Sequence, residues 1–286
     1  METLRLIFIY SVPVVILLAT VEALVFWLRK GGDYDWRAYF ASLADLLGRQ
    51  YVVFTLLPIG LADPAIAWAW SHRIATVPLS GVGAFAALFL GQEFCYYWFH
   101  RCAHRVRWLW ATHAVHHSSN QFNLAAAYRF GWTGRLSGIP IFFVPLVWLG
   151  FPAPIVFATL NLNLLYQFWL HVDWVPKLGF VEFVFNTPSH HRVHHAANPE
   201  YLDANYGGVL IIFDRLFGTL RLERDELPCR YGLVEPLRSN NPVRIAFHEW
   251  LAFARDLWAA CSWRETRQAL FGPPSTIGLQ LYRNAR

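Results

Sequence analysis

Four long apolar stretches, separated by shorter polar ones, organise the first two thirds of the chain. They cover residues 4–28, 51–70, 77–99 and 136–170. A helix of about 20 apolar residues crosses a bilayer, so the first three each predict one membrane helix. The fourth is longer, and the sequence Pro152-Ala-Pro154 in its middle predicts a hairpin of two helices.

The second stretch is the weakest of the four, because Asp63-Pro64 interrupts it. We therefore expect an all-α, polytopic membrane protein with about four to five membrane helices, one pair of them a hairpin. Residues 38–47 predict a short helix at the membrane interface. Residues 242–270 mix apolar and charged positions at helical spacing, which predicts an amphipathic helix that packs on the domain rather than lying on the membrane.

The basic residues orient this arrangement. The polar stretch 29–50 carries four Lys or Arg residues, whereas the link 71–76 carries only Arg73. Basic loops stay on the cytoplasmic side, so stretch 29–50 is predicted to be cytoplasmic and the link to lie outside. The third helix and the hairpin then bring His100, His171 and everything after residue 172 to the cytoplasmic face.

Composition supports an integral membrane protein: 56% of the 286 residues are hydrophobic and only 15% are charged. The net charge of +5 is attributed to cytoplasmic loops and not to nucleic-acid binding. Four cysteines without CxxC spacing exclude a zinc ribbon and do not indicate a disulfide framework. We divide the chain into membrane anchor helices (1–74), a catalytic domain (75–240) and an amphipathic C-terminal tail (241–286).

Histidine is the most informative residue type. Ten of the 12 histidines fall between positions 100 and 195, and eight of them form three clusters. Spacings of three and four residues place each cluster on one helical face. Eight imidazoles are too many for one ion and suit two ions held close together. The clustered histidines are His100, His104, His113, His116, His117, His191, His194 and His195.

Several neighbouring side chains are candidates to complete or support this site. His171 is a candidate ligand, and Gln167 lies one helical turn before it. His190 is either a ligand or a supporting residue, and Glu93 shares the helical face of His100 as a ligand or as a partner that orients an imidazole. The further supporting candidates are Asn123, Arg192 and Asn205.

The type of metal follows only in part from the residues. Histidine-rich sites suit iron, copper, zinc and nickel. HExxH and GxSxG motifs are absent, which argues against a zinc protease and a serine hydrolase. A histidine-rich site beside an apolar medium favours O₂ chemistry on a lipid. A metal transporter is a remote alternative, because transport sites lie within spanning helices and these clusters lie at their ends.

Around the histidines the chain resembles the fatty acid hydroxylase/sterol desaturase superfamily, most closely its alkylglycerol monooxygenase branch. The similarity covers roughly residues 75–275. It is carried by residues 96–104 (YYWFHRCAH), 112–120 (THAVHHSSN), 185–195 (FNTPSHHRVHH), 205–219 and 270–274.

This resemblance implies an O₂-dependent oxidase that hydroxylates the alkyl chain of a lipid, possibly an ether lipid, with two Fe²⁺ ions held by the eight clustered histidines. It also implies an external electron donor, either reduced pterin, cytochrome b5 or a ferredoxin, which the sequence does not decide. Action on a sterol, carotenoid or fatty-acyl chain, by desaturation or hydroxylation, is the alternative.

Overall fold

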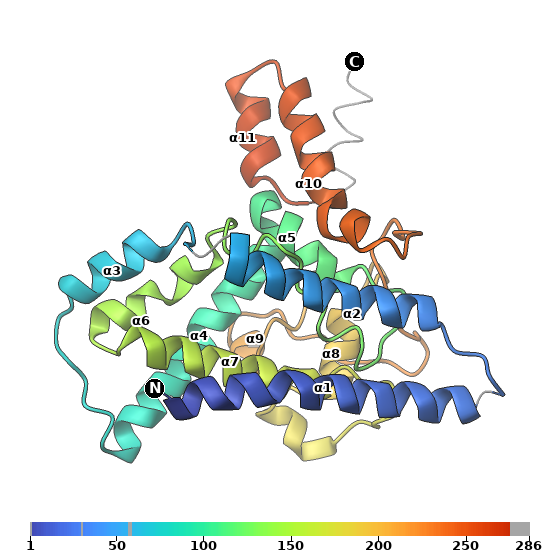
Figure 1. Cartoon of the computed structure of the whole chain (residues 1–286), viewed down its shortest axis with the longest axis horizontal. Coiled ribbons are helices and arrows are strands. Elements are labelled where there is room, and N and C mark those ends of the chain that lie inside the picture. Colours follow the sequence, from blue (N-terminus) through green and yellow to red (C-terminus); the bar gives the residue numbers. More distant parts are fainter. Residues whose placement is uncertain (1, 30, 57–58, 275–286) are drawn as a thin grey trace.

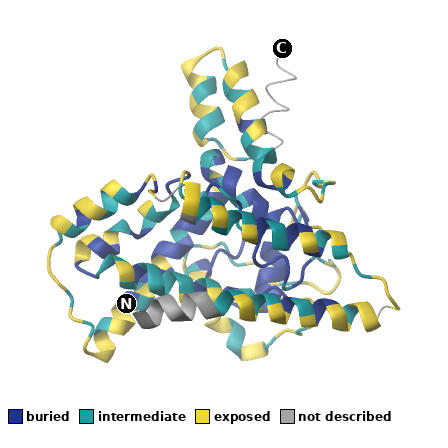
Figure 2. Cartoon of the chain, viewed as in Figure 1, coloured by how far each residue is buried: buried dark blue, intermediate teal, exposed yellow. Residues whose placement is uncertain are grey.

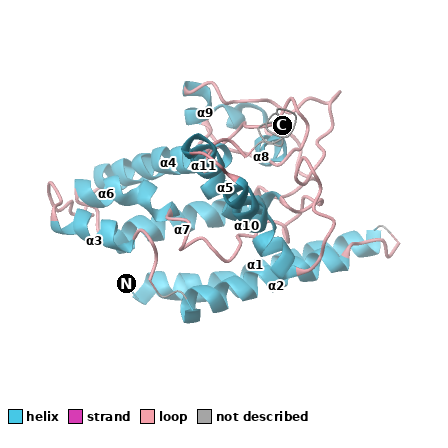
Figure 3. Ribbon diagram, turned by 90° about the horizontal axis from the view of Figure 1, so that it is seen from above, coloured by secondary structure: helices cyan, strands magenta, loops and turns pink. Residues whose placement is uncertain are grey.

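The computed structural model describes residues 2–29, 31–56 and 59–274, and within these ranges every extended regular element is a helix (Figures 1 and 3). Two isolated β-bridges, Phe185 with Leu210 and Ala196 with Tyr231, are the only strand-like pairings described. The all-α prediction is therefore confirmed.

Helix α1 (Glu2–Arg29) corresponds to the first apolar stretch. Its part from Ser11 to Arg29 has a mean hydropathy of 2.2 and is only 17% buried. Among the described helices it alone is long and apolar enough to cross a membrane. Glu22 is a buried exception on this helix, and its carboxylate accepts hydrogen bonds from Leu124 N (2.7 Å) and Trp174 Nε1 (3.2 Å). These bonds attach α1 to two loops of the domain.

The second apolar stretch does not form one helix, so that prediction is wrong. Helix α2 (Trp36–Tyr51) contains the expected interfacial segment and continues as a π-helical turn, η1 (Val52–Leu56). Helix α3 (Asp63–Ser71) starts separately. The Asp63 carboxylate accepts a hydrogen bond from Gly60 N (2.8 Å), and Pro64 occupies the first turn, where its missing N–H costs nothing. Asp63-Pro64 thus begins a helix instead of weakening one.

The third stretch forms α4 (Val82–Arg105), which extends beyond residue 99 and carries His100 and His104 on its last turns. Helix α5 (Arg107–His117) follows almost directly. The predicted hairpin is present as η2 (Ile139–Phe143), α6 (Val144–Leu149) and α7 (Ala153–Trp169). At its tip Gly150 has φ +115°, and a Cβ there would collide with the backbone of Ala75.

The hairpin tip therefore lies against the link before α4. Ile74 N donates to Trp148 O (2.9 Å) and Val77 N donates to Gly150 O (3.0 Å). The opposite end of the molecule contains η3 (Gly179–Phe183), α8 (Pro188–His194) and α9 (Ile212–Leu216). Buried residues concentrate there, around α5 and α8, whereas α1 is largely exposed (Figure 2).

The C-terminal region forms two helices and not the single one predicted. Helices α10 (Pro242–Ala259) and α11 (Trp263–Phe271) are separated by a break at 260–262, where Ser262 caps α11 through Glu265 N. Together they project from the body (Figure 1). The start of α10 packs on α2 and α5, and an ion pair between Arg107 and Asp256 (2.6 Å) joins it to α5.

Candidate metal centre

Nine histidines come together in two groups whose ring nitrogens, within each group, all lie within 4.8 Å of one another. The first group has five members and the second has four. Both are almost entirely buried. The first group contains His100, His104, His113, His117 and His194; the second contains His116, His171, His191 and His195. All nine are residues that the sequence singled out as candidate ligands.

Helical spacing determines how each helix divides its histidines between the groups. In α5, His113 and His117 are four residues apart and join the first group, while His116 points to the second. In α8 and its cap, the corresponding pair is His191 and His195, which joins the second group. His171, just after α7, completes the second group.

Backbone carbonyls orient four of these rings from behind. The Nδ1 atom of His100 lies 3.0 Å from Tyr206 O, and that of His194 lies 2.9 Å from Ala204 O. A carbonyl accepts and cannot donate, so each Nδ1 carries the proton and each Nε2 presents its lone pair to the group. In the second group the same bonds join His116 to Arg129 O (3.1 Å) and His171 to Gln167 O (2.9 Å).

The resulting geometry fits metal ions. His116 Nε2 and His171 Nε2 face each other at 3.3 Å, each with a lone pair, and two lone pairs in contact repel unless a cation lies between them. His194 Nε2 is buried without any hydrogen-bond partner. Nitrogens on one first-row ion lie about 2.1 Å from it, hence about 3.0–3.4 Å from each other.

The other nitrogen pairs match this spacing. His113 Nε2 lies 3.0 Å from His100 Nε2, 3.1 Å from His104 Nε2 and 3.2 Å from His117 Nε2. In the second group, His191 Nε2 lies 3.1 Å from both His171 Nε2 and His195 Nε2. The donor set of buried, neutral imidazoles thus suits two first-row transition ions, one in each group.

Burial keeps the imidazoles neutral. It lowers the pKa of His113 to about 3, helped by the nearby His194 ring. Burial also lowers the pKa of His194 to about 4, against the opposing effect of its hydrogen bond to Ala204 O. Neutral imidazole is the form that binds metals, so at neutral pH no proton has to leave these rings.

The turn around Asn205 supports the first group. Asn205 has φ +57°, and its side-chain amide donates to His190 O (3.0 Å) and Arg221 O (2.8 Å). Asp214 accepts from Tyr206 N and Gly207 N, both at 2.7 Å. These bonds fix the two carbonyls, of residues 204 and 206, that orient His194 and His100. The sequence predicts Asn205 as a supporting residue, but not that neighbouring backbone carbonyls hold ring nitrogens.

Glu93 lies outside both groups, although it is buried. One carboxylate oxygen accepts from Val209 N and Leu210 N (2.8 Å each), and the other accepts from Asn163 Nδ2. Asn163 Oδ1 in turn accepts from Gln167 Nε2 (2.6 Å). Glu93 therefore fastens α4 to α7 and to the Asn205 turn, and Gln167 contributes its side chain to this network and its carbonyl to His171.

The three other supporting candidates serve local structure. His190 is fully buried, but it belongs to neither histidine group. Asn123 caps a turn through Ala126 N (3.0 Å) and donates to Tyr34 Oη (3.3 Å). Arg192 forms a two-pronged ion pair with Glu223 (2.8 and 2.7 Å), which holds α8 against the chain that follows α9.

Sequence reasoning missed Asp45 and Arg129. Asp45 Oδ2 accepts from Phe130 N (3.1 Å) and Gly131 N (3.2 Å), while the Arg129 guanidinium donates to Ser42 Oγ (2.7 Å) and Ala38 O (3.1 Å). Both residues fix the segment whose carbonyl orients His116. The available signal was a charged residue in the middle of an amphipathic helix. Buried charged side chains are paired, so such a residue predicts a partner elsewhere in the fold.

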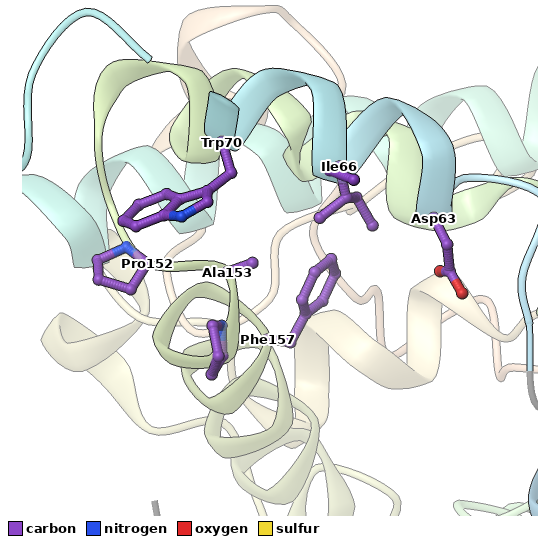
Figure 4. A pocket seen from close by; sticks show the side chains of 8 residues that line it. Asp63, Ile66, Trp70, Pro152, Ala153 and Phe157 are labelled. Carbon is purple, nitrogen blue, oxygen red and sulfur yellow. The ribbon is translucent and has the colours of Figure 1, made fainter. Parts of the chain in front are cut away.

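A surface cavity of about 660 Å³ is not lined by any of the nine histidines. It lies between α3 and the start of α7 (Figure 4), at the hairpin end of the molecule. Its labelled lining residues are Asp63, Ile66, Trp70, Pro152, Ala153 and Phe157. None of these belongs to either histidine group.

The described helices and the two buried groups of imidazoles fit a histidine-rich, non-haem metal site. The family model of fatty acid hydroxylases matches residues 85–219, a range that contains all nine histidines. Residues 85–219 are therefore a fatty acid hydroxylase domain.

Similar curated proteins agree with this assignment. Human alkylglycerol monooxygenase is 36% identical over 267 residues, which make up 92% of this chain and 58% of that protein. Zebrafish alkylglycerol monooxygenase is 39% identical over 79% of this chain and 50% of its own length. The ornithine lipid hydroxylase of Rhizobium tropici is 33% identical over 44% of this chain and 38% of its own length. No solved structure matches the chain.

The chain thus spans only 50–58% of these two alkylglycerol monooxygenases.

Proposed function

We propose that this protein is a membrane-bound, non-haem di-iron oxygenase that uses O₂ to hydroxylate the alkyl chain of a lipid. The observation that carries the proposal is the pair of histidine groups, whose lone pairs converge at distances that only bound cations make favourable. Iron is the proposed metal because residues 85–219 match the fatty acid hydroxylase family. Bound iron would supply the activation of O₂.

The protein's own residues hold and orient the site. His100, His104, His113, His117 and His194 would hold one ion, and His116, His171, His191 and His195 the other. Carbonyls behind four rings fix their tautomers, which increases their basicity as ligands. Burial excludes water, which protects the oxidising equivalents from side reactions. His190, Glu93, Gln167, Asn123 and Asn205 then act on ligands only through the backbone and helix packing.

The names of the similar proteins indicate the substrate class. Alkylglycerol monooxygenases match most of this chain, and a lipid hydroxylase matches part of it. We therefore propose an ether lipid of the alkylglycerol type as substrate and hydroxylation as the reaction. The electron donor is external, either a reduced pterin or a small redox protein.

We further propose that α1, η1 with α3, α4 and the α6–α7 hairpin form the membrane part, with the histidine groups at its cytoplasmic face. The hairpin tip and the link before α4 are joined at one end, and the histidines lie at the other. Basic residues in the stretch 29–50 support the cytoplasmic assignment of the histidine end. The limits 1–74, 75–240 and 241–286 are proposed as anchor, catalytic domain and tail.

The test uses the full chain purified in nanodiscs. Iron is measured per chain. The protein is then incubated with hexadecylglycerol, O₂ and either reduced pterin or a reduced ferredoxin. Two irons per chain and a product with one added oxygen atom are expected. A product that has lost two hydrogens would establish a desaturase instead, and absence of bound iron in active protein would overturn the metal assignment.

The cytoplasmic assignment has its own test. Cys261 is exposed beyond α10, on the proposed cytoplasmic side. A membrane-impermeant maleimide should label it in inside-out vesicles and not in intact cells. Labelling in intact cells would reverse the proposed orientation.

A further inference from the structure

A second cavity, of about 150 Å³, lies among α1, α2, α7 and the segment 127–130. Most of its lining is apolar, and the polar lining residues are Ser11, Arg49, Gln50 and Asn161. The apolar lining residues are Val12, Val15, Leu46, Ala127, Tyr128, Phe130, Ala158, Leu162, Leu164, Leu165 and Phe168. An apolar cavity with a few polar groups in its wall is typical of a ligand site.

The inner wall of this cavity is also the outer wall of the second histidine group. The Phe130 ring lines the cavity and is stacked on His116, with ring centroids 5.6 Å apart and an angle of 2° between the planes. Arg129, the residue before it, supplies the carbonyl that orients the His116 ring (3.1 Å). One aromatic ring therefore separates the cavity from a proposed iron ligand.

This wall is held in place from α2. The amides of Phe130 and Gly131 donate to the Asp45 carboxylate, and the Arg129 side chain is bound to Ser42 and Ala38 O. The Arg49 guanidinium lies over the Phe130 ring, 5.2 Å from its centroid. The ring is thus in contact with both Arg49 and His116, which hold it in place beside the site.

The other side of the cavity opens toward the surface that a bilayer would cover. Leu162 and Leu165 on α7 line the cavity and are still 50% and 40% exposed. On α1, Leu18 lies one helical turn after the cavity-lining Val15 and is 47% exposed. A lipid chain could therefore pass between α1 and α7 without crossing water.

We propose that this cavity binds the segment of the lipid alkyl chain next to the reacting carbon, and that Phe130 positions this segment at the second histidine group. Arg49, Gln50 and Asn161 donate hydrogen bonds to the oxygen-bearing headgroup, while the rest of the chain extends between α1 and α7. The occupant is a long-chain lipid with one oxygen-rich polar group. This inference rests on the proposed function, because it assigns the substrate site of the same reaction.

Photo-crosslinking tests where the chain binds. The probe is hexadecylglycerol with a diazirine in its alkyl chain, added to the iron-loaded protein and to the protein stripped of iron by a chelator. In both forms we expect label on residues 11–15 and 158–168, displaced by unlabelled hexadecylglycerol. Label confined to 63–70 and 152–157 would assign the chain to the larger cavity and overturn the inference.

A matched pair of substitutions on α1 tests the role of the cavity. Val15→Trp fills it, whereas Leu17→Trp places the same ring on the exposed face of the same helix. Val15→Trp should reduce specific labelling and kcat/KM about tenfold with two irons still bound, and Leu17→Trp should change them less than about twofold. If Val15→Trp loses iron, Ala158→Leu fills the same cavity from α7 and decides the question. Equal labelling and kinetics in the filled variant and the control would overturn the inference.

Phe130→Ala tests the positioning role. Removing the ring should let the chain slide toward His116, so the added oxygen should appear on more than one carbon by mass spectrometry, with iron content unchanged. A product oxidised at the original single carbon would contradict it. If the lipid is oxidised but the label lies elsewhere, this inference is wrong and the proposed function stands. If the cavity is labelled specifically but no lipid is oxidised, the proposed function is wrong and the binding site stands.

Discussion

The two His-x-x-His-His motifs, in α5 and at α8, have the same spacing but divide oppositely between the histidine groups. The i,i+4 pair of α5, His113 and His117, belongs to the first group, and the corresponding pair of α8, His191 and His195, belongs to the second. Each motif sends its remaining histidine to the other group. Spacing fixes which imidazoles share a side of a helix, whereas helix packing decides which group that side meets.

The strongest test of this division removes, from each motif, the one histidine that belongs to the other group from its i,i+4 pair. His116→Ala should empty the second group and His194→Ala the first, because each group loses a ligand with no replacement nearby. Iron should fall from two per chain toward one, and lipid oxidation should fall by more than about 100-fold, beyond the effect of losing a supporting residue. Metal analysis and product mass spectrometry measure both.

His72→Ala is the matched control, since His72 is exposed at the end of α3 and bonds only to its own helix and Ser71. It should retain full iron and activity. Full iron occupancy in both His116→Ala and His194→Ala would refute the ligand assignment.

A smaller effect is expected from Asp214→Asn. Both carboxylate oxygens of Asp214 accept backbone amides of the Asn205 turn, and Oδ1 also accepts from Thr219 Oγ1 (2.6 Å). An amide has one acceptor oxygen, so the turn that orients His100 and His194 must loosen. Iron affinity of the first group should fall about 10–100-fold, as measured by chelator competition, with the second group retained. Equal loss from both groups would show that the turn serves the whole site.

Asp45 offers the corresponding test for the second group, with a weaker effect. Only Oδ2 of Asp45 accepts hydrogen bonds, from Phe130 N and Gly131 N. Asp45→Ala should lower iron affinity of the second group about tenfold, because the segment that orients His116 loses its anchor. Asp45→Asn keeps one acceptor oxygen and should restore most of the affinity. Equal iron affinity in Asp45→Ala and Asp45→Asn would show that the Asp45 hydrogen bonds do not support this group.

The smallest expected effect per residue is the loss of folding stability of the iron-free protein as the pH falls. Burial lowers the folded-state pKa of His113 to about 3 and of His194 to about 4, below the unfolded value of about 6.5. The unfolded chain then binds more protons, so stability falls as the pH drops from about 6.5 toward 4. Between pH 7 and 6 each such histidine should cost about 0.7 kcal/mol. Thermal unfolding of the chelator-stripped protein in nanodiscs measures this loss of stability. A Tm that rises as the pH is lowered to 6 would contradict the predicted direction of the effect.

Much of the fold and of the candidate site was predictable because it depends on local pattern. Apolar length predicted α1 and α4, and Pro152-Ala-Pro154 predicted the α6–α7 hairpin, since proline ends one helix and starts the next. Histidine spacing predicted shared helical faces. The prediction for the second apolar stretch failed because apolar content does not reveal whether Asp63 will begin a new helix.

The sequence by itself determined the helical character of the described chain and the set of nine histidines that form the two groups. Only the tertiary structure decided how the nine divide, and that Glu93 and Gln167 tie helices together instead of joining a group. The physical reason is range. Spacing along one helix is set by 3.6 residues per turn, but a carbonyl at residue 129, 204 or 206 reaches its imidazole only when distant segments pack.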